Sequence, residues 1–256
     1  MRKLKLIGVG AGNPDYITVQ AINALQQVDV IFLTDKGEEK RDLLRIRTEI
    51  CARYMGTRKY RVLEMKDPER DRAATAYEPS VVDWHERRAA LYGQVLRDEL
   101  SDGECGAFLV WGDPSLYDST LRIVDRLTAR AELEIDLEII PGITSIQALA
   151  ARHRIALNQI GEPIHVTTGR RLKDEVFNAG ASVVVLLDRG CAFKGLAVDD
   201  IDIFWGAYIG TPDEILVSGR LGEVSERIEE IRAQARNQHG WIMDTYLLRK
   251  RETSSH

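Results

Sequence analysis

Residues 4–33 read LKLIGVGAGNPDYITVQAINALQQVDVIFL, and this one segment predicts the fold class. The apolar run Leu4–Val9 contains one glycine and is followed by two more. This pattern is expected for a buried strand that ends in a turn. Thr18 can cap the helix that follows, because its hydroxyl can accept a hydrogen bond from an amide of the first turn. A second apolar run, Val28–Leu33, predicts another strand. Strand, helix and strand form a βαβ unit, in which the two strands run parallel.

The same alternation continues beyond residue 33. We predict helices over 41–55, 80–100, 120–129 and 144–152, and strands over 60–64, 105–111 and 135–140. After that the rhythm changes, because only one long helix, 223–237, accompanies the strand candidates 164–168, 183–187, 202–208, 215–218 and 241–248. With so few crossover helices, some of these strands must run antiparallel. We therefore expect an α/β protein with two α/β domains, the first with a mainly parallel sheet and the second with a mixed sheet.

The sharpest break in the pattern is Gly112-Asp113-Pro114, directly after a predicted buried strand. We place the domain boundary just beyond it. The expected division is an N-terminal domain over 1–116, a second domain over 117–251, and a polar tail over 252–256.

Composition excludes several classes of function. A formal net charge of -5 argues against a generally basic nucleic-acid binder, so an acidic substrate would need a local cluster of Arg and Lys. No stretch approaches the ~20 apolar residues of a membrane span. The N-terminus lacks the apolar region of a signal peptide, and we expect a cytoplasmic protein. Cys51, Cys105 and Cys191 lack the short spacing of a zinc or redox site, so we expect buried, reduced thiols and no metal.

The first glycine loop, residues 8–13, has the sequence GVGAGN. A dinucleotide-binding fingerprint needs glycines at relative positions one, three and six, and the sixth position here is Asn13. This spacing counts against NAD binding. Two interpretations remain open: a tight turn from strand to helix, and a loop whose bare backbone lies against a substrate.

Two further loops each follow a predicted strand. Residues 111–117 read WGDPSLY, and residues 140–145 read IPGITS. Ligands of open α/β sheets bind at the carboxyl ends of the strands, where both loops would lie. Pro114 restricts Asp113 and so fixes the direction of its carboxylate. An ordinary turn remains the alternative for either loop taken alone.

Together the three loops resemble the tetrapyrrole methylase family, the class III methyltransferases. The residues that carry the resemblance are VGAGNPDYIT at 9–18, GDPSLY at 112–117 and PGITS at 141–145. Asn13-Pro14 departs from the commoner Asp-Pro, which puts in doubt any role carried over to residue 13. The resemblance runs across nearly the whole chain. It implies a tetrapyrrole substrate, a homodimer, and S-adenosylmethionine held in a cleft between two α/β domains, with S-adenosylhomocysteine as the product.

The resemblance also implies which residues contact this cofactor. In the family the N-terminal glycine loop does not bind it. Carried over to this sequence, the expected contacts are Gly112, Asp113, Tyr117, Thr144 and Ser145, with Leu187 and Ala207 added from the later strand ends.

Other segments resemble one branch of the family, whose members methylate a precorrin and remove a two-carbon unit as acetate. They are 35–38, 83–88, 151–155, 161–171, 205–214 and 239–246. Loss of acetate needs a general base and a group that stabilises an oxyanion. Asp35, Tyr117 and His165 are the candidates, and the sequence does not choose between them; a histidine in a strand is often structural.

Substrate contacts follow from charge and from the resemblance. A tetrapyrrole carries many carboxylates, and Arg170 and Arg171 follow a Thr-Thr-Gly turn at a strand end, where a guanidinium can bind a carboxylate through two hydrogen bonds. A solvated pair on a surface turn is the alternative. Gly10, Gly12 and Lys36 complete the expected substrate contacts. Arg87 and Arg88 lie within a predicted helix, and we expect both on its exposed face.

Three rival hypotheses stay open at this point. The chain could act on another tetrapyrrole, such as uroporphyrinogen III or a different precorrin. It could be a nicotinamide-dependent oxidoreductase, although the glycine spacing counts against that. It could also be an α/β interaction module without catalytic activity.

Overall fold

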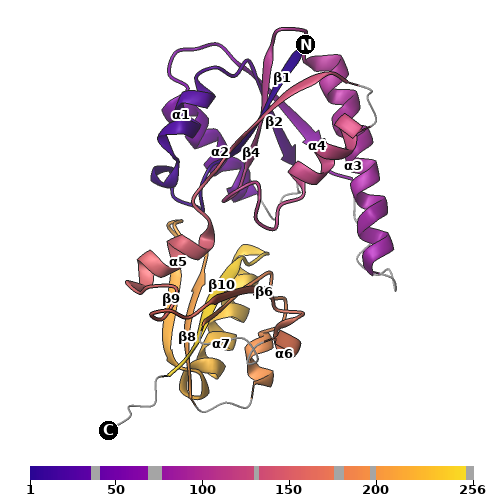
Figure 1. Ribbon diagram of the computed structural model, residues 1–256. Helices are drawn as coiled ribbons and strands as arrows, with labels where there is room; N and C mark the ends of the chain where they lie inside the picture. The colour runs from indigo at the N-terminus through magenta and orange to yellow at the C-terminus, as the bar shows by residue number, and fades with distance from the viewer. Residues whose placement is uncertain (36–40, 69–76, 130–132, 176–181, 197–199, 252–256) are drawn as a thin grey trace. The chain divides into compact units, whose positions relative to one another are not determined.

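The structure is a computed structural model that describes residues 1–35, 41–68, 77–129, 133–175, 182–196 and 200–251. The chain divides into two compact units, Met1–Thr144 and Ser145–His256 (Figure 1). Each unit contains its own five-stranded sheet, and each is described here by itself.

The sheet of the first unit has the strand order β3-β2-β4-β1-β5, and all four neighbouring pairs are parallel. Its strands are β1 (Arg2–Gly8), β2 (Val30–Asp35), β3 (Arg61–Lys66), β4 (Cys105–Val110) and β5 (Ile135–Ile140). The helices between them are the 3-10 turn η1 (Pro14–Tyr16), α1 (Val19–Leu25), α2 (Arg41–Tyr54), α3 (Tyr77–Glu99) and α4 (Thr120–Ala129). Thr18 caps α1 as predicted, with its hydroxyl 3.1 Å from the amide of Ala21.

Both faces of this sheet are covered by helices, as a parallel sheet requires. Side chains of α1 and α2 pack with Ile7, Ile31 and Leu109 on one face. Side chains of α3 and α4 pack with Leu6 and Phe108 on the other face. All six residues of the central strand β4 are therefore buried, which explains why this segment is a continuous apolar run.

The connections define a topological switch point in this sheet. β1 leads through α1 on one face toward β2, whereas its neighbour β4 leads through α4 on the opposite face toward β5. Ligands of open α/β sheets bind outside the carboxyl ends of the strands at such a point. The carboxyl ends of β1 and β4 are therefore the place where the fold favours a site.

The second unit contains a mixed sheet of order β6-β7-β10-β8-β9, in which β6 and β7 are parallel and the other neighbouring pairs antiparallel. Its strands are β6 (Ile164–Thr168), β7 (Ser182–Leu186), β8 (Ile201–Ala207), β9 (Ile215–Arg220) and β10 (Asp244–Lys250). Its helices are α5 (Ser145–His153), α6 (Leu172–Glu175), the 3-10 turn η3 (Ala192–Gly195) and α7 (Leu221–His239). The prediction of a parallel first sheet and a mixed second sheet is confirmed.

The division of the chain lies later than the sequence suggested. We expected the boundary after residue 116, but the first unit continues to Thr144. The reason is the pairing of β5 with β1, in register from Arg2↔Ile135 to Ile7↔Ile140. α4 also packs on the first sheet, so the break at Gly112-Asp113-Pro114 is a loop within one unit rather than a boundary. The expected tail, 252–256, lies outside the described residues.

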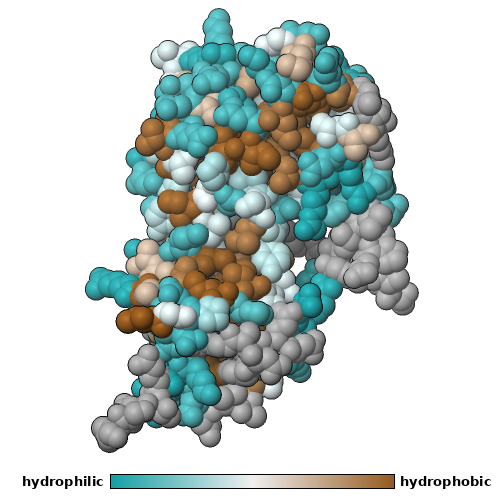
Figure 2. All heavy atoms as spheres, viewed as in Figure 1, coloured by the Kyte–Doolittle hydropathy of each residue, from teal (hydrophilic) through white to brown (hydrophobic). Residues whose placement is uncertain are grey.

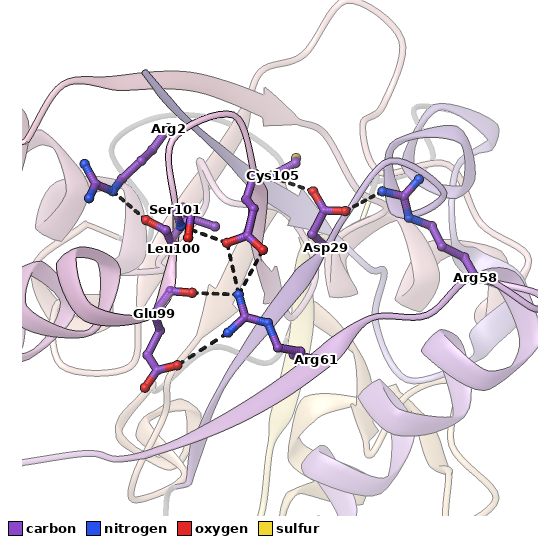
Figure 3. A network of polar contacts seen from close by, with 9 residues as sticks. Arg2, Asp29, Arg58, Arg61, Glu99, Leu100, Ser101 and Cys105 are labelled. Carbon is purple, nitrogen blue, oxygen red and sulfur yellow. Dashed lines mark hydrogen bonds and ion pairs between the residues drawn. The ribbon is translucent and has the colours of Figure 1, made fainter.

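A polar network joins the amino ends of the strands in the first unit (Figure 3). Asp29, just before β2, accepts a hydrogen bond from the amide of Cys105 at 2.9 Å and pairs with Arg58 at 2.5 Å. Arg61, at the start of β3, lies 3.0 Å from the carboxylate of Glu104. These contacts are partly exposed, so each contributes little to stability. They mark the edge of the sheet opposite the switch point, and we assign them a structural role.

The surface carries hydrophilic residues interspersed with smaller hydrophobic patches, as is usual for a folded chain (Figure 2). Within the described residues, no helix has the length and apolar character needed to cross a membrane. Cys51, Cys105 and Cys191 are all buried and unpaired, as predicted. Burial raises the pKa of Cys51 and that of Cys191 to about 11, so both thiols stay protonated near neutral pH.

The prediction for Arg88 was wrong. Arg87 is exposed as expected, but Arg88 is only 3% exposed. Its Nε lies 2.7 Å from the carboxylate of Asp67, and its Nη1 donates to the hydroxyl of Ser119 at 2.6 Å. Its guanidinium also lies over the ring of Trp84. Helical periodicity did not reveal this, because the side chain is buried through polar contacts rather than through an apolar pattern.

Replacing Arg88 with Met should lower the free energy of unfolding by about 3 kcal/mol, because the nearly buried carboxylate of Asp67 would lose its ion pair with Arg88. The matched control is Arg87→Met on the same helix, whose exposed pair with Asp83 is worth about 0.5 kcal/mol or less. Chemical denaturation of both variants measures the difference. Equal effects of the two substitutions would contradict the structural role of Arg88.

Candidate functional site

Three loops of the first unit meet at the carboxyl edge of its sheet, and their closest approach is made by glycines. A Cβ added to Gly8, at the end of β1, would lie 2.8 Å from the carbonyl oxygen of Gly112 and 2.8 Å from the Cα of Gly142. A Cβ added to Gly142 would overlap the same carbonyl oxygen of Gly112. The backbones that follow β1, β4 and β5 therefore touch directly, which only residues without a side chain allow.

Asp113 fastens two of these loops together. Its Oδ2 accepts a hydrogen bond from the amide of Gly142 at 2.8 Å, and its Oδ1 accepts from the amide of Ser115 at 2.7 Å and from the hydroxyl of Ser115. Burial raises the pKa of Asp113, but these three donors outweigh it and hold the pKa below its ordinary value. The carboxylate thus positions the loops themselves, and its contact with the cofactor remains a prediction from the family resemblance.

The space beside Gly112 is open, next to Thr144 of the following loop. Gly112 has φ +70, and a Cβ there would meet only the Cα of Thr144, at 3.8 Å. Tyr117 has φ +50 although it is not glycine, a conformation that costs about 1–3 kcal/mol, and its side chain is 47% exposed. Strain of this kind is common at functional sites. The space beside Gly112 and the buried Thr144 therefore fits a ligand lying against bare backbone, and Tyr117 follows in the same loop as Gly112.

The first glycine loop lies beside this one. The backbone of Gly10 exchanges two hydrogen bonds with that of Gly112, at 3.3 and 2.9 Å. Gly10 and Gly12 both have positive φ, and a Cβ on Gly10 would collide with Tyr16. These two glycines are thus explained by backbone geometry. Their proposed contact with substrate remains a prediction.

In the second unit, candidate residues also gather where strands end. Leu187 directly follows β7 with φ +53, and its apolar side chain is 61% exposed. Ala207, the last residue of β8, is fully buried, so only its backbone can contact a ligand. Ser145, at the start of α5, shares a hydrogen bond of 3.1 Å with the hydroxyl of Thr245 in β10. The register of β7, β8 and β10 brings these three residues to one edge of the sheet.

A buried polar network supports the loop that carries Leu187, and sequence reasoning did not find it. Asp188 accepts hydrogen bonds from the amides of Gly190 and Ala192 at 2.9 and 2.7 Å and from the hydroxyl of Tyr246 at 2.7 Å. Arg232 of α7 donates to the carbonyl oxygen of Asp188 at 2.7 Å. Burial, together with the Asp188 carboxylate, raises the pKa of Tyr246. The only sequence signal was an acidic residue at the end of an apolar strand.

Arg232 also forms an ion pair with Asp244 at 2.9 Å, with both side chains nearly buried. The carboxylate of Asp244 accepts a further hydrogen bond from the indole of Trp205 at 3.1 Å. Burial tends to lower the pKa of Arg232, but Asp244 outweighs it and raises that pKa. The ion pair and the hydrogen bonds satisfy the buried polar groups of this network, which suits a scaffold that fixes a loop.

The remaining predicted residues differ in their placement. Arg170 and Arg171 follow β6 at the same edge as Leu187, since the amide of Gly169 donates to the carbonyl of Leu186. His165 pairs in register with Val183, near the amino end of β6 and β7, away from that edge. The structure therefore does not bring His165 together with Leu187.

The side chain of Asp35 and all of Lys36 lie outside the described residues. No group of His, Cys, Asp and Glu able to hold a metal was found among the residues that the structure describes.

The chain is similar to known proteins over most of its length. The family model described as Tetrapyrrole (Corrin/Porphyrin) Methylases matches residues 3–225. Precorrin-6A synthase [deacetylating] of Sinorhizobium sp. is 51% identical over 250 residues, covering 98% of this chain and 96% of that protein.

Solved structures show the same fold. The crystal structure of a cobalamin synthesis related protein, CobF, from Corynebacterium diphtheriae has a TM-score of 0.82 and 40% identity, covering 98% of this chain and 99% of that one. Uroporphyrin-III C-methyl transferase from Thermus thermophilus, complexed with S-adenosyl homocysteine, has a TM-score of 0.57 and 17% identity, covering 96% of each chain. The latter likeness shows the fold alone.

Replacing Gly142 with Ala should separate the loops after β1, β4 and β5, because the new Cβ would overlap the carbonyl oxygen of Gly112. We expect a loss of at least about 2 kcal/mol of stability and at least tenfold weaker binding of S-adenosylhomocysteine. The control is Gly222→Ala in α7, where nothing lies within 4 Å of the added Cβ and where alanine favours the helix. Thermal melting and calorimetry test both variants; an unaffected Gly142→Ala protein would exclude the close approach.

Replacing Asp113 with Asn removes the anionic acceptor that holds the amides of Gly142 and Ser115. The pKa of Asp113 is lowered in the folded protein, so its carboxylate stabilises the fold above the unfolded-state pKa of about 4, and this contribution disappears as the pH falls through the folded-state value. Wild type should therefore be more stable than Asp113→Asn at pH 7, with the difference shrinking below about pH 4. Denaturation curves across this pH range measure it, and a constant difference would argue against the ionic tether.

Proposed function

The chain belongs to the tetrapyrrole methylase family, and from this premise we propose that it is a precorrin-6A synthase of the deacetylating type. It would transfer a methyl group from S-adenosylmethionine to carbon 1 of precorrin-5 and release acetate, a step of cobalamin biosynthesis. The observation that carries the proposal is the identity with the Sinorhizobium enzyme along nearly the full length of both chains.

Use of S-adenosylmethionine is supported by the family and by the residues present. A structural neighbour of the same fold holds S-adenosylhomocysteine. In the first unit, the open position beside Gly112 and Thr144 suits a ligand that lies against backbone. In the second unit, the exposed Leu187 and the backbone of Ala207 are the matching candidates. Ser145 would contribute its hydroxyl, which Thr245 already orients.

The chemistry of methyl transfer fits a site that contains no catalytic triad. The donor supplies an electrophilic methyl group on a positively charged sulfur, and an electron-rich pyrrole carbon needs little further activation. The protein must mainly align the two partners, which can contribute about 7–11 kcal/mol. The tether from Asp113 to Gly142 and the network around Asp188 suit this task, because they fix loops rather than move protons.

Release of acetate demands more from the protein. Water must add to an acetyl carbonyl, and the bond from that carbon to the ring must break, so a base and an oxyanion donor would contribute. Tyr117 lies exposed in the loop after β4 and remains our candidate for a hydrogen-bond donor. His165 is less well placed than we expected, since it lies toward the amino end of its strand. Asp35 remains a candidate base on sequence grounds alone.

A homodimer remains a prediction from the family resemblance, and a cytoplasmic location remains a prediction from the N-terminal sequence. Sedimentation of the purified chain tests the first, and fractionation of cells that express it tests the second.

The product distinguishes this function from its relatives. We expect incubation with precorrin-5 and methyl-labelled S-adenosylmethionine to give a tetrapyrrole that has gained one methyl group and lost a two-carbon acid, together with free acetate. Mass spectrometry and an acetate assay measure the two parts separately. Methyl gain without acetate would identify a different tetrapyrrole methyltransferase, which is the runner-up hypothesis.

Calorimetric titration separates the other classes. S-adenosylhomocysteine should bind, and NADH should not. Binding of NADH alone would favour an oxidoreductase. Binding of neither ligand, with no change in Asp113→Ala, would favour an interaction module.

A further inference from the structure

A cationic side chain that the sequence did not single out lies at the carboxyl edge of the first sheet. Arg47 of α2 donates from Nε to the carbonyl oxygen of Leu109 at 2.9 Å and from Nη1 to that of Leu43 at 3.0 Å. Leu109 is the second-last residue of β4, directly before the loop that carries Gly112 and Asp113. Arg47 is therefore held at the switch point of the sheet, where the fold favours a ligand.

The charge of Arg47 is not neutralised by any side chain that the structure describes. Its two hydrogen-bond partners are uncharged carbonyl groups, and no carboxylate of the described side chains lies within 4.0 Å of its nitrogens. Burial lowers the pKa of Arg47, and the more distant Asp118 offsets this only in part. A guanidinium nonetheless stays protonated in proteins, so a largely desolvated positive charge persists here.

Two other arginines show what a structural role looks like in this protein. Arg88 and Arg232 are more deeply buried, and each has a carboxylate within 3 Å: Asp67 at 2.7 Å and Asp244 at 2.9 Å. Arg47 is partly exposed, and none of the described side chains supplies it with such a carboxylate. Asp118, whose charge acts on Arg47 from a distance, accepts a hydrogen bond from the amide of Thr120 at the start of α4. Arg47 thus keeps donor capacity and charge for an anion from outside the chain.

We propose that Arg47 binds a carboxylate of the tetrapyrrole substrate at the carboxyl end of β4. The inference rests on the proposed function, because a precorrin carries several acetate and propionate side chains. A carboxylate would neutralise this partly buried charge and accept hydrogen bonds from the guanidinium N–H groups that the two carbonyls do not engage. It would also anchor the substrate next to the loop that contains Tyr117. Arg47 is then a substrate-binding residue of the first unit, in addition to the predicted contacts Arg170 and Arg171 of the second unit.

Arg47→Met tests the proposal, with Arg45→Met as the matched control. Arg45 lies on the same helix and is exposed, so its removal changes net charge equally without touching the site. We expect Arg47→Met to raise the KM for the tetrapyrrole about 10- to 100-fold, the range for losing one charge-assisted contact. Affinity for S-adenosylhomocysteine should stay unchanged and serves as the check on folding. Arg47→Lys should fall between, because an ammonium keeps the charge but not the planar fork.

A second measurement reports the carboxylate directly and needs no turnover. Uroporphyrin III and its fully esterified form are titrated against the wild type and the variants. In the wild type the acid should bind more tightly than the ester, and in Arg47→Met this preference should shrink by the same factor as the KM rises. A structural role alone would not change the preference between acid and ester.

The results of these experiments distinguish failure of the Arg47 proposal from failure of the proposed function. If Arg47→Met behaves as Arg45→Met, or if it retains the full preference for the acid, the proposal is overturned. Loss of S-adenosylhomocysteine binding in both Arg47→Met and Arg47→Lys also overturns it, because Arg47 would then only support the loop after β4. If the wild type methylates no tetrapyrrole yet prefers the acid through Arg47, the anion site stands and the proposed function fails.

Discussion

The direct contact of three backbones at Gly8, Gly112 and Gly142 is the constraint on which the candidate site of the first unit depends. No side chain fits between them, so the ends of β1, β4 and β5 are held at one point. The carboxylate of Asp113 fastens this contact through the amide of Gly142. Because the three strands are parallel neighbours, their loops leave the sheet at one edge, and the strained Tyr117 is presented there.

In the second unit, buried charged groups rather than glycines fix the loop that carries Leu187. The carboxylate of Asp188 accepts hydrogen bonds from two amides and from the hydroxyl of Tyr246. Arg232 donates to the carbonyl oxygen of Asp188 and forms an ion pair with Asp244. Arg232 and Asp244 tolerate burial because they form an ion pair, and the Asp188 carboxylate does so because three hydrogen bonds satisfy it. They hold Leu187 in a left-handed conformation that an apolar residue rarely adopts. In both units the residues that fix the loops are different from those that the loops present.

Three arginines, Arg47, Arg88 and Arg232, differ in the partners of their guanidinium groups. Arg88 and Arg232 pair with carboxylates of the chain, and they are explained by structure alone. Arg47 pairs only with backbone carbonyls among the described residues, at the edge where a ligand is expected. The positive charge of Arg47 suits a family whose substrates are rich in carboxylates.

The sequence by itself determined the α/β class, the parallel first sheet, the mixed second sheet and the three signature loops, because apolar periodicity, glycine and proline act locally along the chain. Only the tertiary structure decided that β5 belongs to the first sheet, that Asp113 serves as a tether, that His165 lies away from Leu187, and that Arg88 is buried. These features depend on strand register and on contacts between residues far apart in the chain. Such pairings leave no trace in local periodicity, since a charged residue has the same pattern whether it faces solvent or a partner on another element.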